Sequence, residues 1–261
     1  MQFGYMPSFF ERDLIHEIDF AKNHFDFIEI TPDIENLKYY IQNSNAIKSS
    51  LRNFQVLGHI HWGINLAENN RNEIKKAIKS VAILKKYGAK KITIHPSFKS
   101  KNSLNFIRKN NLISLAEISD YCDKNDVELL VENIAHRPFN RAVDFQTLLK
   151  KFPKVGITLD IGHVKQFSDL EFNKFLKLKD KIRHIHLHHN IGKSDHLPFN
   201  DVSGMERIVR KIRKVNSGFT VTLEIFYLCR YGKRIDMNTD YRRKVLLKQL
   251  SSLKKISKSV E

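Results

Sequence analysis

Short apolar runs alternate with amphipathic stretches along the chain. The apolar runs have the length and composition of β-strands. They lie at residues 2–6, 25–31, 55–62, 90–97, 127–134, 155–163, 182–189 and 219–226. Between them, apolar residues recur at helical spacing, for example at Ile74, Ile78, Val81 and Leu84. Strands that alternate with single helices pair in parallel through right-handed crossovers.

Eight strand–helix units in 261 residues predict an α/β fold. The specific prediction is a single (β/α)8 TIM barrel with parallel strands, occupying residues 1–261 as one domain. An open doubly wound sheet is the alternative. It is disfavoured because no glycine-rich turn follows the first strand.

The strand pattern also predicts which side chains point into the barrel, because successive residues of a strand face opposite sides. In residues 220–225, Val221, Leu223 and Ile225 form an apolar face that packs against the helices, so Glu224 points inward. The same test on the other strands finds an inward acid or imidazole near several C-terminal ends. The resulting set is His59, His95, Glu132, Asp160, His186 and Glu224.

This inward set is typical of a metal site. Enzymes with this fold carry their reacting groups at the C-terminal ends of the strands. Isolated carboxylates are costly to bury, and a divalent ion compensates for that cost. Imidazole and carboxylate ligands suit zinc and manganese. His61, His184, His188 and His189 cannot all be ligands, and they support the site or line the barrel. His136 is expected to be structural or exposed.

Seven short motifs follow the strands in order. They are His59-Ile60-His61-Trp62-Gly63-Ile64-Asn65-Leu66-Ala67, Ile94-His95-Pro96-Ser97, Val131-Glu132-Asn133, Leu159-Asp160-Ile161-Gly162-His163, His184-Ile185-His186-Leu187, His196-Leu197-Pro198 and Leu223-Glu224. Together they resemble the xylose isomerase-like TIM-barrel superfamily, which includes endonuclease IV and the sugar phosphate isomerases and epimerases. The resemblance covers essentially the whole chain, and it is more specific for the superfamily than for one activity.

The resemblance implies roles for individual residues. Glu132, Asp160, His186 and Glu224 correspond to the metal site shared across the superfamily. His59 and His95 correspond to ligands of a neighbouring metal that Glu132 bridges, as in endonuclease IV-like enzymes. His163 and His196 correspond to ligands of a third metal. The Asp expected two residues before His196 is Ser194 here, with Asp195 adjacent. We therefore expect two zinc ions, and three if Asp195 substitutes.

Two chemistries compete for this set of residues. The favoured hypothesis is a metal-dependent hydrolase resembling endonuclease IV, which cleaves a phosphodiester in abasic-site DNA or in another substrate. It gives a role to the histidines beyond the shared metal site, and Arg137 and Arg230 are its candidate phosphate-binding residues. The alternative is a sugar or sugar-phosphate isomerase or epimerase with Mn or Mg, in which Glu132 and Glu224 form an acid–base pair. A binding barrel without turnover is disfavoured by the largely intact ligand set.

The net charge of +17 leaves one question open. Basic residues are spread along the helices, which favours a solvated surface. A preference for a polyanionic partner, either DNA or a phosphorylated small molecule, remains the alternative.

Two cysteines exclude a disulfide scaffold. No secretory signal or membrane-length apolar run is visible, so a cytoplasmic protein without a membrane partner is expected. The oligomeric state stays open.

Overall fold

Eight parallel strands form a closed barrel in the computed structural model, which describes residues 1–7, 13–166, 168–191, 194–214, 218–230 and 233–259. The barrel strands are β1 (Gln2–Tyr5), β2 (Phe27–Ile30), β3 (Gln55–His59), β4 (Lys91–Ile94), β5 (Glu128–Glu132), β6 (Gly156–Asp160), β7 (Ile182–Leu187) and β10 (Thr220–Leu223). Their order around the barrel is the chain order, and β10 closes the circle by pairing with β1 and β7. The predicted (β/α)8 fold is confirmed.

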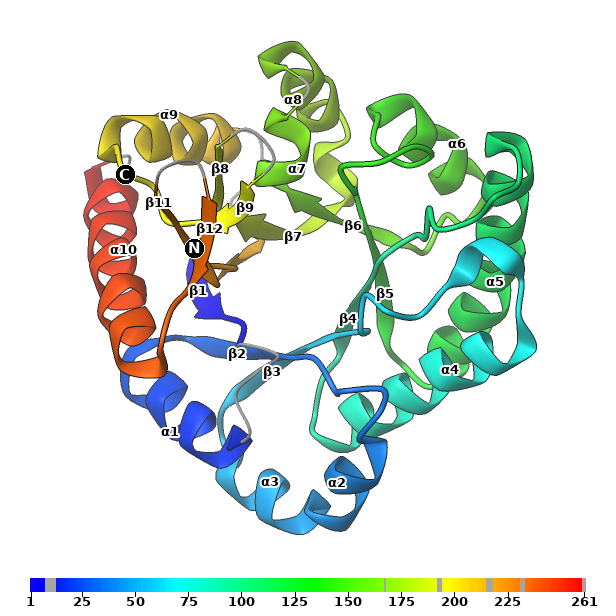
Figure 1. The fold of residues 1–261 in the computed structure, drawn as a ribbon, viewed down its shortest axis with the longest axis horizontal. Coiled ribbons are helices and arrows are strands. Elements are labelled where there is room, and N and C mark those ends of the chain that lie inside the picture. The colour runs from blue at the N-terminus through cyan, green and yellow to red at the C-terminus, as the bar shows by residue number, and fades with distance from the viewer. Residues whose placement is uncertain (8–12, 167, 192–193, 215–217, 231–232, 260–261) are drawn as a thin grey trace.

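Helices surround the barrel on its outside (Figure 1). The α-helices are α1 (Leu14–His24), α2 (Leu37–Gln42), α3 (Ser44–Ser50), α4 (Arg71–Lys86), α5 (Leu104–Lys124), α6 (Ala142–Lys151), α7 (Ile161–Lys165), α8 (Asp169–Leu176), α9 (Val202–Arg213) and α10 (Thr239–Ser259). Short 3-10 helices are η1 (Leu66–Glu68) and η2 (Lys179–Lys181). Among the described residues, none of the helices has the length and apolar character needed to cross a membrane.

Two antiparallel hairpins add to the simple strand–helix alternation. They are β8 (His189–Ile191) with β9 (Ser194–Leu197), and β11 (Tyr227–Arg230) with β12 (Lys233–Asp236). The strand expected at residues 155–163 also ends early, because α7 begins at Ile161. The Asp160 side chain caps that helix by accepting a hydrogen bond from the His163 N–H at 2.6 Å. Asp160 therefore ends the strand and starts the helix.

The predicted alternation of inward and outward side chains is confirmed. Val221 and Leu223 are buried against the helix layer. Inside the barrel, Thr93 and Thr158 hydrogen-bond to each other across 2.8 Å, and Thr220 lies 2.6 Å from His184 Nδ1. The barrel interior is thus a hydrogen-bonded polar core, which is stable because its buried polar groups find partners. The apolar core lies between the strands and the helices.

Candidate metal centre and active site

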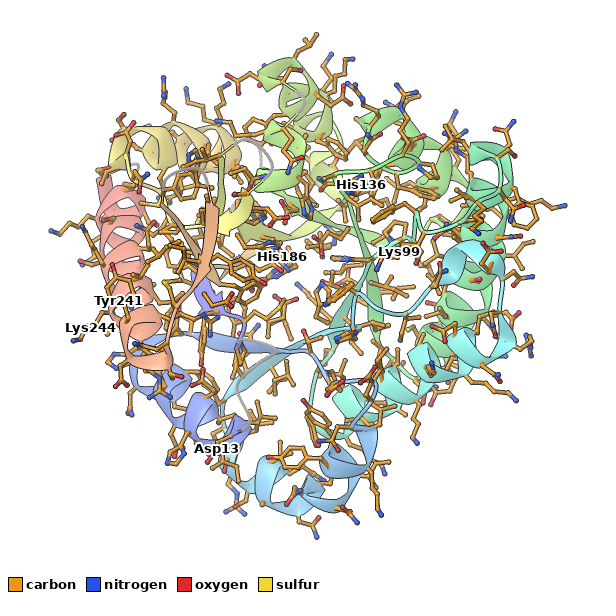
Figure 2. The ribbon with its side chains drawn as sticks, viewed as in Figure 1. Asp13, Lys99, His136, His186, Tyr241 and Lys244 are labelled. Carbon is orange, nitrogen blue, oxygen red and sulfur yellow. The ribbon has the colours of Figure 1, made fainter. Side chains whose placement is uncertain are left out.

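Six neighbouring strands bring imidazoles and carboxylates together at one end of the barrel. His59, Glu132 and Asp160 are the last residues of β3, β5 and β6. His186 lies one residue before the end of β7, while His95 and Glu224 directly follow β4 and β10. His186 lies near the middle of the barrel in Figure 2. Because all of these strands run parallel, their C-terminal ends converge at the same mouth.

Glu132, Asp160, His186 and Glu224 form the first cluster. Each offers one ligand atom, and these atoms lie within 4.8 Å of one another. His186 Nδ1 is 3.2 Å from Glu132 Oε2 and 3.2 Å from Glu224 Oε2. All four residues are buried. Two carboxylates from well-separated strands therefore meet at one imidazole nitrogen.

His59, His95 and Glu132 form a second cluster beside the first. His59 Nε2 lies 3.2 Å from Glu132 Oε2, and His95 Nε2 lies 2.9 Å from the same oxygen. The ligand atoms of this group also lie within 4.8 Å of one another. Glu132 is common to both clusters, and its Oε2 is the atom that His59, His95 and His186 all contact.

The donor atoms of these two clusters fit a divalent metal. Within the described part of the chain, several buried atoms there make no hydrogen bond: His59 Nδ1, His95 Nε2, Glu132 Oε1, His186 Nδ1 and Glu224 Oε2. Buried polar groups are normally hydrogen-bonded, and an unsatisfied one costs about 1–3 kcal/mol. A cation that accepts lone pairs from imidazole and carboxylate would satisfy those of these atoms that face one another, such as His186 Nδ1 and Glu224 Oε2.

A third cluster, His163, His188 and His196, is less suited to a metal. The backbone N–H of His196 donates to His188 Nδ1 at 3.0 Å, and His188 Nε2 lies 2.9 Å from Asp160 Oδ2. Both ring nitrogens of His188 are therefore in use. Asp195 Oδ1 contacts His196 Nδ1 at 3.2 Å, but Asp195 is not part of the cluster. The structure gives the third ion less support than the first two.

Glu29 is a buried acid at the site that the inward set above does not include. Its Oε2 lies 3.2 Å from His186 Nε2 and 2.9 Å from His184 Nε2, and it accepts a hydrogen bond from the Thr222 hydroxyl at 2.6 Å. A carboxylate behind a ligating histidine fixes its ring orientation. With Nε2 held by Glu29, His186 presents Nδ1 to Glu132 and Glu224.

Glu29→Gln should therefore weaken metal binding without removing a ligand of the first or second cluster. The amide cannot accept from His184 and His186 as the carboxylate does, so the His186 ring loses its fixed orientation. Loss of such a supporting carboxylate lowers metal affinity about 10–100-fold. Titrating the metal-stripped protein with Zn²⁺ and Mn²⁺ measures this. Glu35→Gln, at the rim of the pocket, is the control. Equal affinities for the two variants would contradict the role given to Glu29.

The charges of the cluster stabilise one another. Burial raises the pKa of Glu132, but the attraction of His95 and His186 outweighs burial and holds the pKa well below its usual range. Burial lowers the pKa of His186, yet Glu132 and Glu29 hold it well above its usual range. For His196, Glu224 and Asp195 outweigh burial and raise the pKa to about 10. The buried carboxylates thus require nearby positive charge, which imidazolium groups or a divalent ion can provide.

A pocket of about 690 Å³ opens above these clusters at the barrel mouth. His59, His95 and Glu224 form part of its wall, and Asp195 and His196 lie in the same wall. Arg137 is exposed and is not among the lining residues, so the structure does not bring this predicted phosphate ligand to the site. The side chain of Arg230 lies outside the described residues. All eight predicted metal ligands, by contrast, lie at or beside the clusters.

The chain belongs to the family of xylose isomerase-like TIM barrels, whose family model matches residues 17–253. A segment of 119 residues is 31% identical to the uncharacterized protein MJ1614 of Methanocaldococcus jannaschii. That match covers 42% of this chain and 44% of the other protein, so it spans less than half of the relative's length.

Solved structures with the same fold include several sugar epimerases. D-psicose 3-epimerase from Clostridium cellulolyticum H10, solved with D-tagatose, is 16% identical over the full length of both chains, with a TM-score of 0.75. The 3-keto-D-glucoside 4-epimerase YcjR from E. coli is 16% identical over 99% of both chains, with a TM-score of 0.73. At this level of identity the similarity establishes the fold alone.

Proposed function

We propose that the protein is a metal-dependent sugar isomerase or epimerase, with Glu132 and Glu224 as the proton-transferring pair. The contact of both carboxylates with one atom, His186 Nδ1, at 3.2 Å carries this proposal. Two carboxylates at one centre can remove a proton from a carbon and return one to its other face. The epimerases among the structures of similar fold support this choice over the hydrolase.

Each glutamate has a distinct role in the proposed reaction. Attraction to His95 and His186 keeps the pKa of Glu132 low, so Glu132 is ionised and can accept a proton from the substrate carbon. Glu224 Oε1 lies 3.4 Å from His196 Nε2, and His196 lines the open pocket. Attraction to His196 and His186 outweighs burial and holds the pKa of Glu224 well below its usual range as well, so Glu224 is also ionised. The proton that Glu224 delivers to the substrate carbon therefore comes from His196, whose pKa is raised to about 10, and His196 then takes up a proton from solvent.

The first cluster would hold the metal through Glu132, Asp160, His186 and Glu224. A divalent ion there supplies Lewis acidity toward neighbouring oxygens of the sugar. Glu29 holds the His186 ring, and the Asp160 Oδ2 contact with His188 at 2.9 Å holds that carboxylate.

A phosphodiesterase is the second candidate, and the second cluster favours it. An epimerase that works with one ion needs neither His59 nor His95 as a ligand, yet both meet Glu132 within 3.2 Å. His59, His95 and Glu132 would hold a second ion beside the first, and a pair of ions would supply the charge stabilisation that phosphodiester cleavage needs. Zinc would be the expected metal of such a phosphodiesterase, as in the hydrolase hypothesis drawn from the sequence.

Proton exchange with solvent tests the main proposal. Protein reconstituted with Mn²⁺, Mg²⁺ or Zn²⁺ is incubated in D2O with a panel of ketoses and aldoses, free and phosphorylated, and followed by ¹H NMR. We expect deuterium to enter at one carbon and the epimer or isomer to appear with it. The same preparations are tested on bis(p-nitrophenyl) phosphate and on a duplex with an abasic site.

The variant His95→Ala separates the two candidates. It removes a ligand of the second cluster and leaves the first cluster intact. A sugar epimerase should retain measurable turnover in this variant, whereas a two-metal phosphodiesterase should lose its activity. Phosphodiester cleavage that disappears in His95→Ala, together with no exchange in any sugar, would overturn the epimerase proposal.

A further inference from the structure

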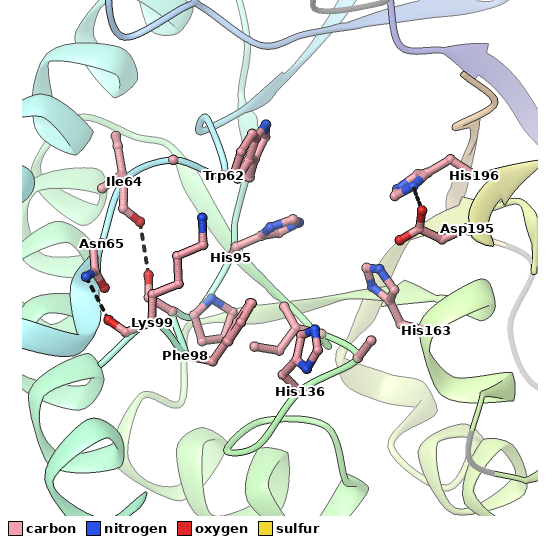
Figure 3. Close-up of a pocket in the computed structure, with 15 residues that line it drawn as sticks. Trp62, Ile64, Asn65, His95, Phe98, Lys99, His136, His163, Asp195 and His196 are labelled. Carbon is pink, nitrogen blue, oxygen red and sulfur yellow. Dashed lines mark hydrogen bonds and ion pairs between the residues drawn. The ribbon is translucent and has the colours of Figure 1, made fainter. Parts of the chain in front are cut away.

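A lateral pocket of about 250 Å³ adjoins the mouth of the barrel. Figure 3 shows Trp62, His95 and Lys99 on one side of this pocket, and His163, Asp195 and His196 on the other. His95 and His196 also line the larger pocket above the clusters. A molecule with one end at the clusters can therefore extend into the lateral pocket without a break.

The lateral pocket is lined by aromatic side chains that remain open to solvent. Trp62 is 50% exposed and Phe98 is 37% exposed. The ring of His136 lies 4.1 Å from that of Phe98, and the Trp62 ring stacks on His61. Flat aromatic faces of this kind complement the faces of other rings. Lys99 Nζ lies 4.7 Å from the centre of the Trp62 ring, where its donors can reach oxygen atoms of a ligand.

Hydrogen bonds, two of them buried, connect the two loops that carry these exposed rings. Trp62 lies on the loop after β3, and Phe98 and Lys99 lie on the loop after β4. The Ser97 hydroxyl donates to the Ile64 carbonyl at 3.0 Å and accepts from the Leu66 N–H at 2.8 Å. Asn65 Nδ2 donates to the Lys99 carbonyl at 2.9 Å. The two loops therefore form one connected wall.

The same wall is fixed from behind by α5. Asn111 accepts from the Ser97 N–H at 2.7 Å and donates to the Ser97 carbonyl at 2.9 Å, and its side chain is fully buried. A wall held in this way binds a ligand without a large ordering cost, which is the main benefit of preorganisation. Scattered exposed apolar residues need no explanation, but two aromatic rings fixed beside a candidate active site indicate a binding surface.

We propose that this lateral pocket binds the second ring of a glycoside, so that the substrate is a sugar joined to a further saccharide or aryl unit rather than a free monosaccharide. The inference rests on the proposed function, because it places the reacting sugar at Glu132 and Glu224. The second ring contacts the solvent-exposed parts of the Trp62 and Phe98 rings, which His61 and His136 support from the side. Lys99, whose Nζ lies over the Trp62 ring, donates to the oxygen atoms of the second ring or to the glycosidic oxygen.

Trp62 is the only tryptophan of the chain, so intrinsic fluorescence reports directly on the proposed pocket. The protein is titrated with phenyl glycosides and with disaccharides of D-glucose and D-galactose, and in parallel with the free hexoses. We expect the glycosides to shift the Trp62 emission at about tenfold lower concentration than the free hexoses. Comparing the titrations with phenyl glycosides and with disaccharides shows whether an aryl ring or a second sugar ring is preferred. Equal responses to glycosides and free hexoses, or no response up to about 10 mM, would overturn the proposal.

Two variants connect the response to the lateral pocket. Phe98→Ala should weaken glycoside binding about three- to tenfold, the loss expected for one aromatic contact. Phe106→Ala removes another exposed ring, 40% exposed and outside the pocket lining, and should change nothing. An unchanged affinity in Phe98→Ala would contradict the proposal.

The variant Glu132→Gln keeps the two proposals distinguishable. It should retain glycoside binding at the lateral pocket even though the cluster is damaged. If the wild-type protein binds glycosides but catalyses exchange in no sugar, the proposed function is wrong and the lateral pocket remains as a ring-binding site. If the wild-type protein turns over free hexoses but glycosides cause no Trp62 response, the proposed role of the lateral pocket is wrong and the proposed function remains.

Discussion

The variant Glu132→Gln should lose bound metal and turnover together. Glu132 belongs to both clusters, and its Oε2 lies within 3.2 Å of His59, His95 and His186. An amide at this position cannot bridge two cations, nor can it accept a proton from carbon. Loss of a general base alone lowers the rate about 10²–10⁴-fold. Because the sugar and phosphodiester reactions both use this carboxylate, the variant should lose whichever activity the wild-type protein has.

Metal content and rate are measured side by side. Elemental analysis after dialysis gives the ions retained per chain, and the exchange and phosphodiester assays give the rate. Glu128→Gln is the matched control, since Glu128 begins the same strand and forms an ion pair with Arg183 at 3.1 Å, far from the mouth. The control should behave as the wild type does. Unchanged metal content in Glu132→Gln would refute the bridging role.

The alternation of side chains along the strands correctly predicts that most residues of the candidate site face the barrel interior. Successive residues of a strand face opposite sides of the sheet. Because Ile92 and Ile94 face the helices, Thr93 must face the barrel interior, and the structure places it there. The closed sheet then brings the inward residues of neighbouring strands together. This is why six residues from distant parts of the sequence can be assigned to one pocket before any coordinates are known.

The same rule could have found Glu29. Ile28 and Ile30 are outward residues of β2, which leaves Glu29 inward, where it contacts His184 and His186. Glu29 also forms a group with His59 and His186 whose ligand atoms lie within 4.8 Å of one another, but its carboxylate is already engaged by His184, His186 and Thr222. Its role depends on the tilt of the His186 ring, and ring tilt is a tertiary property that no spacing encodes.

The loops account for what the sequence does not predict. His136 is exposed, as expected, but the sequence does not predict that its ring lies against Phe98 in the lateral pocket. Its position depends on contacts between two loops whose backbone follows no repeating pattern. The hairpin of β8 and β9, which carries His196 into the mouth, is likewise absent from the predicted alternation.

The surplus of histidines is the reason that the sequence favours the hydrolase. In the structure, two of them already have partners for both ring nitrogens. His184 lies between Glu29 and Thr220, and His188 lies between Asp160 and the backbone of His196. These two imidazoles have structural roles, as expected for residues that support the site. The case for further ions therefore rests on His59 and His95 in the second cluster, and on His163 and His196 in the less suited third cluster.

The variant Gly162→Ala should disrupt the candidate site by adding one methyl group. An added Cβ at position 162 would lie 2.0 Å from His188 Cε1, which is far inside van der Waals contact. His188 has to move away, and it then loses its contact with Asp160 Oδ2 and its hydrogen bond from the His196 N–H. We expect the free energy of unfolding to fall by about 2–3 kcal/mol. Metal affinity should fall about 10–100-fold, since Asp160 loses its support.

Gly204→Ala provides the matched comparison. Gly204 also lies near the start of a helix, but an added Cβ there would be 3.6 Å from Asp201 Oδ2, an ordinary contact. Replacing this glycine should leave metal affinity unchanged and raise the free energy of unfolding by about 0.4–1 kcal/mol. Urea denaturation and Zn²⁺ titration of both variants measure the difference. If Gly162→Ala binds Zn²⁺ as tightly as Gly204→Ala does, His188 does not support Asp160, and the close packing of α7 against β7 has no bearing on the metal site.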